Sequence, residues 1–225
     1  MRVYKFYSAK WGREALRKKR LKLTTLEDIN DPFEFIPFNL KEKSFRKPLI
    51  DIKEKLLKDK GIICFSRAWN NPVLWSHYAD KHRGLALGFD VPDDLLLAAN
   101  YVQELYDPER FLSELRGSMA SGNNANLMQL LRSVLATKFD HWRYEDEFRL
   151  FVDIDSKESA GPIHFQEFDS DLVLQEVVLG ANYEQCADSL NALDLGQNIM
   201  LTTARIAFTK FEVTKQNLKS KQKSL

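Results

Sequence analysis

Two glutamates stand two positions apart in the segment "FDHWRYEDEFRLFVD", which covers residues 139–153. Side chains alternate between the faces of a β-strand, so a strand over this segment would direct Glu145 and Glu147 to the same face. Arg149 follows on that face, and a nearby cation favours an ionised carboxylate. The pair could stabilise developing positive charge in a reaction. It could equally be a solvated strand face on which Arg149 pairs with Glu147.

The stretch "LWSHYADKHRG", residues 74–84, carries aromatic side chains at helical spacing. The positions i, i+3, i+4 and i+7 of one helix face are held by Trp75, Tyr78, Ala79 and His82. This pattern is typical of an aromatic core stripe, and it would also provide a platform for a flat ring ligand. His77 and His82 do not share a helix face and the other histidines are scattered, so we expect no metal site.

The segment "NDPFEF", residues 30–35, has the residue types of a prolyl turn. The simplest interpretation is a rigid turn in which Phe33 fills part of the core. Asp31 and Glu34 beside this turn could also orient a ligand hydroxyl group.

Apolar periodicity and turn residues predict a mixture of strands and helices around these groups. We expect strands at residues 2–8, around Leu21 to Thr25, and at 61–69, 85–91, 139–153, 162–168, 172–183 and 205–213. We expect helices at residues 10–20, 49–60, 71–84 and 183–195, and from Pro92 to Lys138 with a polar loop at 117–126.

The order of these elements lacks strict strand–helix alternation, which favours an α+β fold with a mixed or antiparallel sheet flanked by helices. The chain of 225 residues is long enough for one good core. We therefore predict a single domain over residues 1–212 and a basic C-terminal tail over residues 213–225.

The charge of the chain is nearly balanced, at +1, but it is unevenly distributed. Residues 1–24 contain nine Lys or Arg and one Glu, and residues 210–225 contain five Lys and one Glu. The basic N-terminal region could contact a nucleic-acid or protein acceptor, and it could also be a solvated helix face. No apolar run approaches membrane-spanning length, so we expect no membrane partner and a cytoplasmic location.

Several common catalytic signatures are missing from the sequence. There is no GxGxxG, GxxxxGK[ST] or GxSxG motif, so dinucleotide-binding Rossmann, P-loop and hydrolase interpretations lack support. The two cysteines have no CxxC spacing, which argues against a zinc site and against a disulfide framework.

Five strings follow one another in an order that resembles an uncharacterised bacterial family of unknown function. They are "VYKFYS", "INDPFEF", "GIICFSRAW", "LWSHYADKHRGLALGFD" and "KFDHWRYEDEFRLF". The resemblance spans roughly residues 3–152. It supplies no activity.

A weaker resemblance is to the ADP-ribosyltransferases, especially bacterial toxins that modify nucleic acids. Their sites begin with a polar residue flanked by aromatic residues on a first strand, and end with a glutamate on a late strand, often as E-x-E. This resemblance implies NAD as a substrate, with Glu147 as the catalytic carboxylate and Glu145 assisting it. It assigns NAD binding to five further residues: Tyr4, Lys5, Phe33, Trp75 and Tyr78. The positive charge of Lys5, Arg13 or Arg149 could meet the pyrophosphate of NAD.

Three functions therefore compete. The first is an NAD-consuming transferase or glycohydrolase, as in a toxin or phage-defence effector. The second is a noncatalytic binding module in which these segments are core and ion-pair framework. The third is a nucleic-acid-processing protein that acts without NAD.

Overall fold

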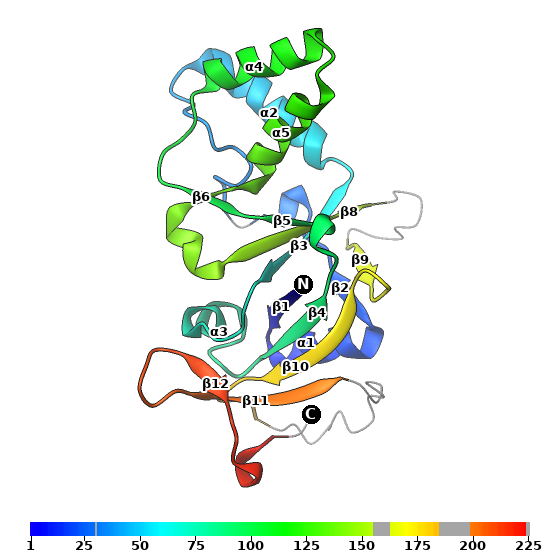
Figure 1. Ribbon diagram of the computed structural model, residues 1–225, viewed down its shortest axis with the longest axis vertical. Helices are drawn as coiled ribbons and strands as arrows, with labels where there is room; N and C mark the ends of the chain where they lie inside the picture. The colour runs from blue at the N-terminus through cyan, green and yellow to red at the C-terminus, as the bar shows by residue number, and fades with distance from the viewer. Residues whose placement is uncertain (30, 155–162, 185–198, 224–225) are drawn as a thin grey trace.

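The computed structural model describes residues 1–29, 31–154, 163–184 and 199–223 (Figure 1). The α-helices in these ranges are α1 (Ala9–Lys18), α2 (Lys43–Leu57), α3 (Pro72–Tyr78), α4 (Pro108–Ala120) and α5 (Asn124–Ala136). The first strands are β1 (Arg2–Tyr7), β2 (Arg20–Lys22), β3 (Lys60–Ser66), β4 (Leu85–Asp90), β5 (Leu96–Ala98) and β6 (Asn100–Val102). The later strands are β7 (Thr137–Phe139), β8 (Glu147–Asp153), β9 (Phe165–Glu167), β10 (Val173–Leu179), β11 (Met200–Ile206) and β12 (Val213–Lys215).

Eight strands of the described residues form one sheet in the order β12-β11-β10-β4-β1-β3-β8-β5. Strands β10 and β11 run parallel, and the other neighbouring pairs are antiparallel. The sheet is therefore mixed, and the predicted single-domain α+β fold is confirmed.

The two faces of this sheet are covered by different helices. Val3 and Leu87 pack with Leu16 of α1 in one buried cluster. Phe6 and Ala86 point to the other face, where they pack with Trp75 of α3. The division follows from the alternation of side chains along β1 and β4.

The sheet opens between β1 and β3. Strand β1 pairs with β4 along its whole length, but it shares only the pair Tyr4 and Ser66 with β3. Farther along β3, Ile62 instead forms a bridge with Thr24. The two strands therefore diverge, and side chains from both strands border the space between them.

Helices α2, α4 and α5 form a helical lobe at one end of the molecule (Figure 1). The lobe has its own apolar cluster, which includes Leu49 of α2, Phe111 of α4 and Val134 of α5. It leads through α5 directly into β7, which carries Lys138.

The prediction of one interrupted helical region from Pro92 to Lys138 is partly wrong. Strand β5 pairs with β8, and β6 pairs in parallel with β7. Leu96 is buried in the main core, so sheet pairing and burial there outweigh local helix propensity. The predicted polar loop at 117–126 is also shorter than expected, because α4 ends at Ala120 and α5 begins at Asn124.

The prediction of a continuous strand over residues 139–153 is wrong in its first half. Residues Asp140–Glu145 form a 3₁₀ helix, labelled η3, and β8 begins only at Glu147. Asp146 joins the two in the left-handed conformation, with φ of 42°. Aspartate tolerates this conformation better than most residues, which makes the change of direction possible.

Helix α3 is shorter than the predicted helix over residues 71–84. It begins as expected, with Asn71 accepting a hydrogen bond from the backbone N–H of Val73 at 2.9 Å. It ends at Tyr78, because Asp80, Lys81 and His82 all have positive φ angles. Gly84 follows, where a side chain would collide with the carbonyl oxygen of Tyr7.

The C-terminal predictions need two corrections. The segment at 205–213 is not one strand, because β11 ends at Ile206 and β12 begins at Val213. Since β12 pairs with β11, the predicted tail over residues 213–225 begins inside the sheet. The helix predicted at 183–195 lies almost entirely outside the described residues. Among the described helices, none is long and apolar enough to cross a membrane.

Candidate functional site

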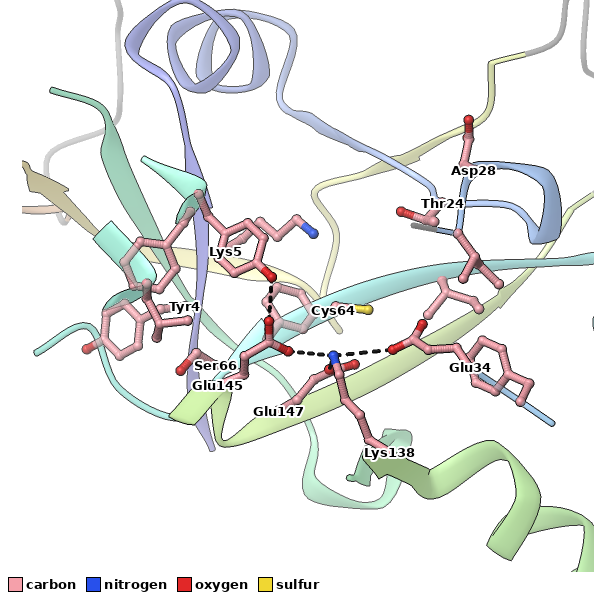
Figure 2. A pocket seen from close by; sticks show the side chains of 17 residues that line it. Tyr4, Lys5, Thr24, Asp28, Glu34, Cys64, Ser66, Lys138, Glu145 and Glu147 are labelled. Carbon is pink, nitrogen blue, oxygen red and sulfur yellow. Dashed lines mark hydrogen bonds and ion pairs between the residues drawn. The ribbon is translucent and has the colours of Figure 1, made fainter. Parts of the chain in front are cut away.

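A cavity of about 260 Å³ lies where β1 and β3 diverge (Figure 2). Its polar and charged lining residues are Tyr4, Lys5, Thr24, Asp28, Glu34, Cys64, Ser66, Tyr78, Lys138, Glu145 and Glu147. These residues come from segments far apart in the sequence. The cavity is therefore a product of the tertiary fold.

Three of the lining residues stand in a row across three strands. Tyr4 of β1 is directly opposite Ser66 of β3, which is directly opposite Glu147 of β8. Directly opposite residues in a sheet point to the same face. Their face is the one that α3 covers, so Tyr78 at the end of α3 can reach the same cavity.

Lys138 lies at the centre of a buried group of charges beside the cavity. Its Nζ lies 3.2 Å from a carboxylate oxygen of Glu34. The same ammonium group donates hydrogen bonds to Glu145, at 2.5 Å, and to Glu147. Figure 2 shows Lys138 between the acidic side chains. Lys138 thus holds together carboxylates from the 31–35 turn, from η3 and from β8.

Arg149 is the second cation of this charge cluster. Its guanidinium group donates to Glu147 at 2.7 Å, to Glu34 at 3.0 Å and to the backbone carbonyl of Leu135 at 2.7 Å. The side chain is fully buried and does not line the cavity. The expectation that Arg149 contacts a bound pyrophosphate is therefore corrected, because its donors are directed at protein groups. Arg149 therefore affects the cavity indirectly, through its hydrogen bond to Glu147.

The two central carboxylates have pKa values shifted in opposite directions. Burial would raise the pKa of Glu147, but Arg149 and Lys138 outweigh it and lower the pKa to about 2. Burial raises the pKa of Glu145 above its ordinary value, although Lys138 opposes this effect. Glu147 is therefore held ionised at neutral pH, while Glu145 is the carboxylate better suited to exchange a proton.

Tyr78 contacts the second of these carboxylates directly. Its hydroxyl group donates a hydrogen bond of 2.5 Å to Glu145. Burial, followed by this contact with Glu145, raises the pKa of Tyr78, so the phenol remains protonated. Tyr78 therefore acts as a hydrogen-bond donor at neutral pH.

Tyr4 and Lys5 come to the cavity from the first strand. The Tyr4 hydroxyl donates to Glu176 at 3.0 Å, so its ring borders the cavity while its polar end is engaged elsewhere. Lys5 also lines the cavity, and within the described part of the chain it forms no salt bridge. Its ammonium group is available to an anionic ligand.

The comparisons with known proteins add one match. Residues 74–150 match the family described as "Protein of unknown function (DUF2971)". No curated protein and no solved structure matches the chain. The match covers about a third of the chain, from α3 into β8.

The matched segment supplies much of the charged site but not all of it. Tyr78, Lys138, Glu145 and Glu147 lie within it. Tyr4, Lys5 and Glu34 lie before it, so the cavity combines the matched segment with the N-terminal part of the chain. The chain is similar to the DUF2971 family over the part that carries Glu145, Glu147 and Lys138.

Besides Arg149, two further residues that were predicted to bind the ligand do not line this cavity. Trp75 is fully buried, packs edge-on against Phe6 and donates a hydrogen bond to the backbone carbonyl of Trp69. It is part of the core, so its proposed role as a ring platform is corrected. Phe33 is 68% exposed and lines a different cavity, and Phe35 is the core residue of that turn. The prediction that Phe33 fills the core is wrong.

The sequence interpretation missed the residue that organises the site. Lys138 stood at the end of a predicted helix, where a lysine suggests only a solvated position. The spacing of residues carried no signal for Lys138, because its role depends on the fold, which brings Glu34, Glu145 and Glu147 together so that they exceed the single cation Arg149. Ser66 and Cys64 also carried no signal, because they lie within an apolar strand.

Proposed function

We propose that the cavity binds the nicotinamide–ribose half of NAD and cleaves the bond between them. The protein would then act as an NAD glycohydrolase or an ADP-ribosyltransferase. The observation that carries this proposal is the pair of carboxylates, Glu145 and Glu147, that line one cavity beside the ammonium group of Lys138. An ionised Glu147 and a proton-exchanging Glu145 are the two groups that cleavage at a sugar carbon requires.

The size of the cavity supports a partial rather than a complete enclosure of NAD. Its volume of about 260 Å³ lies just below the range of about 300–1,000 Å³ that is usual for small-molecule pockets. Such a space suits the nicotinamide and its ribose. The pyrophosphate would lie at the mouth, where Lys5 is available to its negative charge.

The reaction requires one bond to break and one to form at the same carbon. The bond between ribose C1′ and the nicotinamide nitrogen breaks, and nicotinamide leaves with the electron pair as a neutral molecule. Positive charge develops on the ribose, where the Glu147 carboxylate would stabilise it. Water or an acceptor group then bonds to C1′, and its proton passes to Glu145 and from there to solvent.

The aromatic lining fits the same ligand. Phe35, Phe65 and the ring of Tyr4 border the cavity beside the carboxylates. The nicotinamide of NAD is a flat cation, and aromatic faces attract cations of this kind. After cleavage, nicotinamide is neutral and loses this attraction to the aromatic faces, which would assist its release.

The decisive experiment is incubation of the purified protein with NAD, with separation of free nicotinamide by chromatography. A second arm uses labelled NAD to detect transfer to protein or nucleic acid. In the variant Glu147→Gln we expect turnover to fall by about two to three orders of magnitude, the scale for removal of one preorganised stabilising group. Thermal melting of each variant gives the folded fraction, by which activity is normalised.

A matched control is available on the same strand. Asp153 lies at the other end of β8, is exposed and pairs with Lys60, so Asp153→Asn also removes one paired carboxylate. We expect this variant to keep wild-type turnover. Absence of nicotinamide release by the wild-type protein, with and without nucleic acid, would refute the proposal.

One observation favours a noncatalytic role as the second candidate. Both carboxylates take part in buried ion pairs, and such a cluster can serve as a framework that fixes three segments relative to one another. If Glu147→Gln destabilises the protein while activity per folded molecule is unchanged, the framework role is the correct one.

A further inference from the structure

A second cavity lies on the other side of the wall that carries Glu34 and Lys138. It has a volume of about 210 Å³ and is lined by Phe33, Pro37, Val102, Gln103, Glu104, Leu105, Thr137, Lys138 and Phe139. Lys138 lines both cavities. The two cavities are therefore neighbours.

The wall is built from two short segments that each contribute to both sides. In the 31–35 turn, Glu34 joins the buried charge cluster while its neighbour Phe33 lines the second cavity. In β7, the Lys138 side chain reaches the carboxylates, and Phe139 lines the second cavity. Adjacent residues of a strand point to opposite sides, which accounts for this division in β7.

Phe33 is held in an exposed position by a turn that is itself well anchored. Asp31 accepts hydrogen bonds from the Phe33 backbone N–H at 2.9 Å and from the Trp142 indole at 3.0 Å. Phe35 on the far side of Glu34 is buried. The backbone of Phe33 is thus held by Asp31 before it and by the buried Phe35 after it, yet the Phe33 ring is 68% exposed. An exposed aromatic ring on a fixed backbone is suited to stacking on a flat ligand.

The rest of the second cavity has the character of a site for a planar ring with polar edges. Phe139 and Leu105 add exposed apolar surface beside Phe33. Gln103 and Glu104 add side chains that can accept hydrogen bonds from a ring amino group. Among the described residues, Lys138 is the one cation that lines this cavity, and its ammonium group is engaged by carboxylates across the wall. The second cavity is therefore better suited to a nucleobase than to a phosphate group.

We infer that the second cavity binds a nucleobase that carries an exocyclic amino group, stacked on Phe33. This inference extends the proposed function, because it places a base beside the cavity for nicotinamide and ribose. The base can come from the adenine half of NAD itself or from a single-stranded nucleic acid that accepts ADP-ribose. Both sources present the same ring chemistry to Phe33.

The test measures binding by calorimetry with adenosine and with a short adenine-containing single-stranded oligonucleotide, using the full chain. We expect the wild-type protein to bind at least one of them, and Phe33→Ala to weaken that binding roughly tenfold or more, the scale of one lost stacking contact. Phe33→Trp should retain binding because it keeps an aromatic face. Phe208→Ala is the control, since Phe208 is also exposed but lies outside the cavity.

The two ligands separate the two sources of the base. Weaker binding of adenosine, together with a raised KM for NAD in Phe33→Ala, identifies the adenine of NAD. Weaker binding of the oligonucleotide alone identifies an acceptor. The inference is overturned if the wild-type protein binds neither ligand, or if folded Phe33→Ala binds both as the wild type does. These binding measurements need no cleavage, so a protein that releases no nicotinamide refutes the proposed function without deciding this inference.

Discussion

Glu145 and Glu147 illustrate how neighbouring side chains of one type acquire different properties. Both are buried beside the same ammonium group of Lys138. Glu147 also accepts a hydrogen bond from Arg149, whereas Glu145 accepts one from the neutral Tyr78 hydroxyl. A second cation lowers the pKa of Glu147, and without one, burial dominates the pKa of Glu145. The difference lies in the partners and not in the residue type.

The opposite shifts predict opposite pH trends in stability for the variants Glu147→Gln and Glu145→Gln. Glu147 has a pKa lowered to about 2. Its contribution to the free energy of unfolding is therefore present above about pH 4.5 and is lost as the pH falls toward 2. The destabilisation by Glu147→Gln should therefore shrink in acid, by up to about 3 kcal/mol. Glu145 has a raised pKa, so its contribution to the free energy of unfolding is present in acid and is lost as the pH rises through that pKa. The destabilisation by Glu145→Gln should therefore shrink as the pH rises.

Urea unfolding of the wild type and both variants at a series of pH values measures these trends. The informative quantity is the difference in unfolding free energy between each variant and the wild type at each pH. Two difference curves with the same slope would contradict the assignment of separate protonation behaviour to the two carboxylates.

At the scale of single elements, the end of α3 is the most unusual feature. Asp80, Lys81 and His82 follow the helix with φ angles of 46°, 55° and 68°. The left-handed region is unfavourable for residues with a Cβ atom. The turn is held by hydrogen bonds from the backbone N–H of His82 to the Trp75 carbonyl and from that of Gly84 to the Ala79 carbonyl. It ends α3 immediately after Tyr78, which places the Tyr78 hydroxyl at Glu145.

We predict that Lys81→Gly stabilises the protein by roughly 0.5–1 kcal/mol. Glycine adopts a positive φ without steric cost, and this gain exceeds the opposing effect of the greater conformational entropy that glycine gives to the unfolded chain. Lys81 is exposed, so little packing is lost. Lys58, which is exposed and has a φ of −49° after α2, provides the control. Lys58→Gly should destabilise the protein. Chemical unfolding of both variants measures the effects, and destabilisation by Lys81→Gly would show that the lysine side chain stabilises this turn.

At the scale of the whole molecule, the helical lobe and the sheet have separate apolar clusters. The lobe cluster around Phe111 and Leu112 contains no residue of β1, β3 or β4. The main cluster contains residues of all three of these strands. Segments with their own smaller core can open without disrupting the rest of a domain.

We predict that amide hydrogens of α4 and α5 exchange with solvent at a lower free energy of opening than those of β1 and β4. The physical reason is that the lobe opens at the cost of its own cluster alone, whereas exposing β1 requires disruption of the central sheet. Hydrogen exchange followed by mass spectrometry of peptides from each segment tests this. Equal opening free energies in the lobe and the sheet would indicate that the two unfold as one unit.

The local elements of this protein were largely determined by sequence patterns. Residues Arg2–Tyr7, Lys60–Ser66 and Leu85–Asp90 form the expected strands, because their apolar and aromatic side chains suit a sheet that is covered on both faces. Asn71 caps α3 as its position before proline predicts. Glu147 and Arg149 do share one face of β8, since alternation along a strand is a local property.

The site itself was decided by the tertiary structure. Glu145 reaches Lys138 only because a 3₁₀ helix and the left-handed Asp146 replace the expected strand. Phe33 faces outward and Trp75 is enclosed, although the sequence assigned both to NAD binding. Lys138 became visible as the centre of the cluster only when Glu34, Glu145 and Glu147 were brought around it. Burial and charge pairing depend on contacts between distant segments, and these contacts are not encoded in the spacing of residues along the chain.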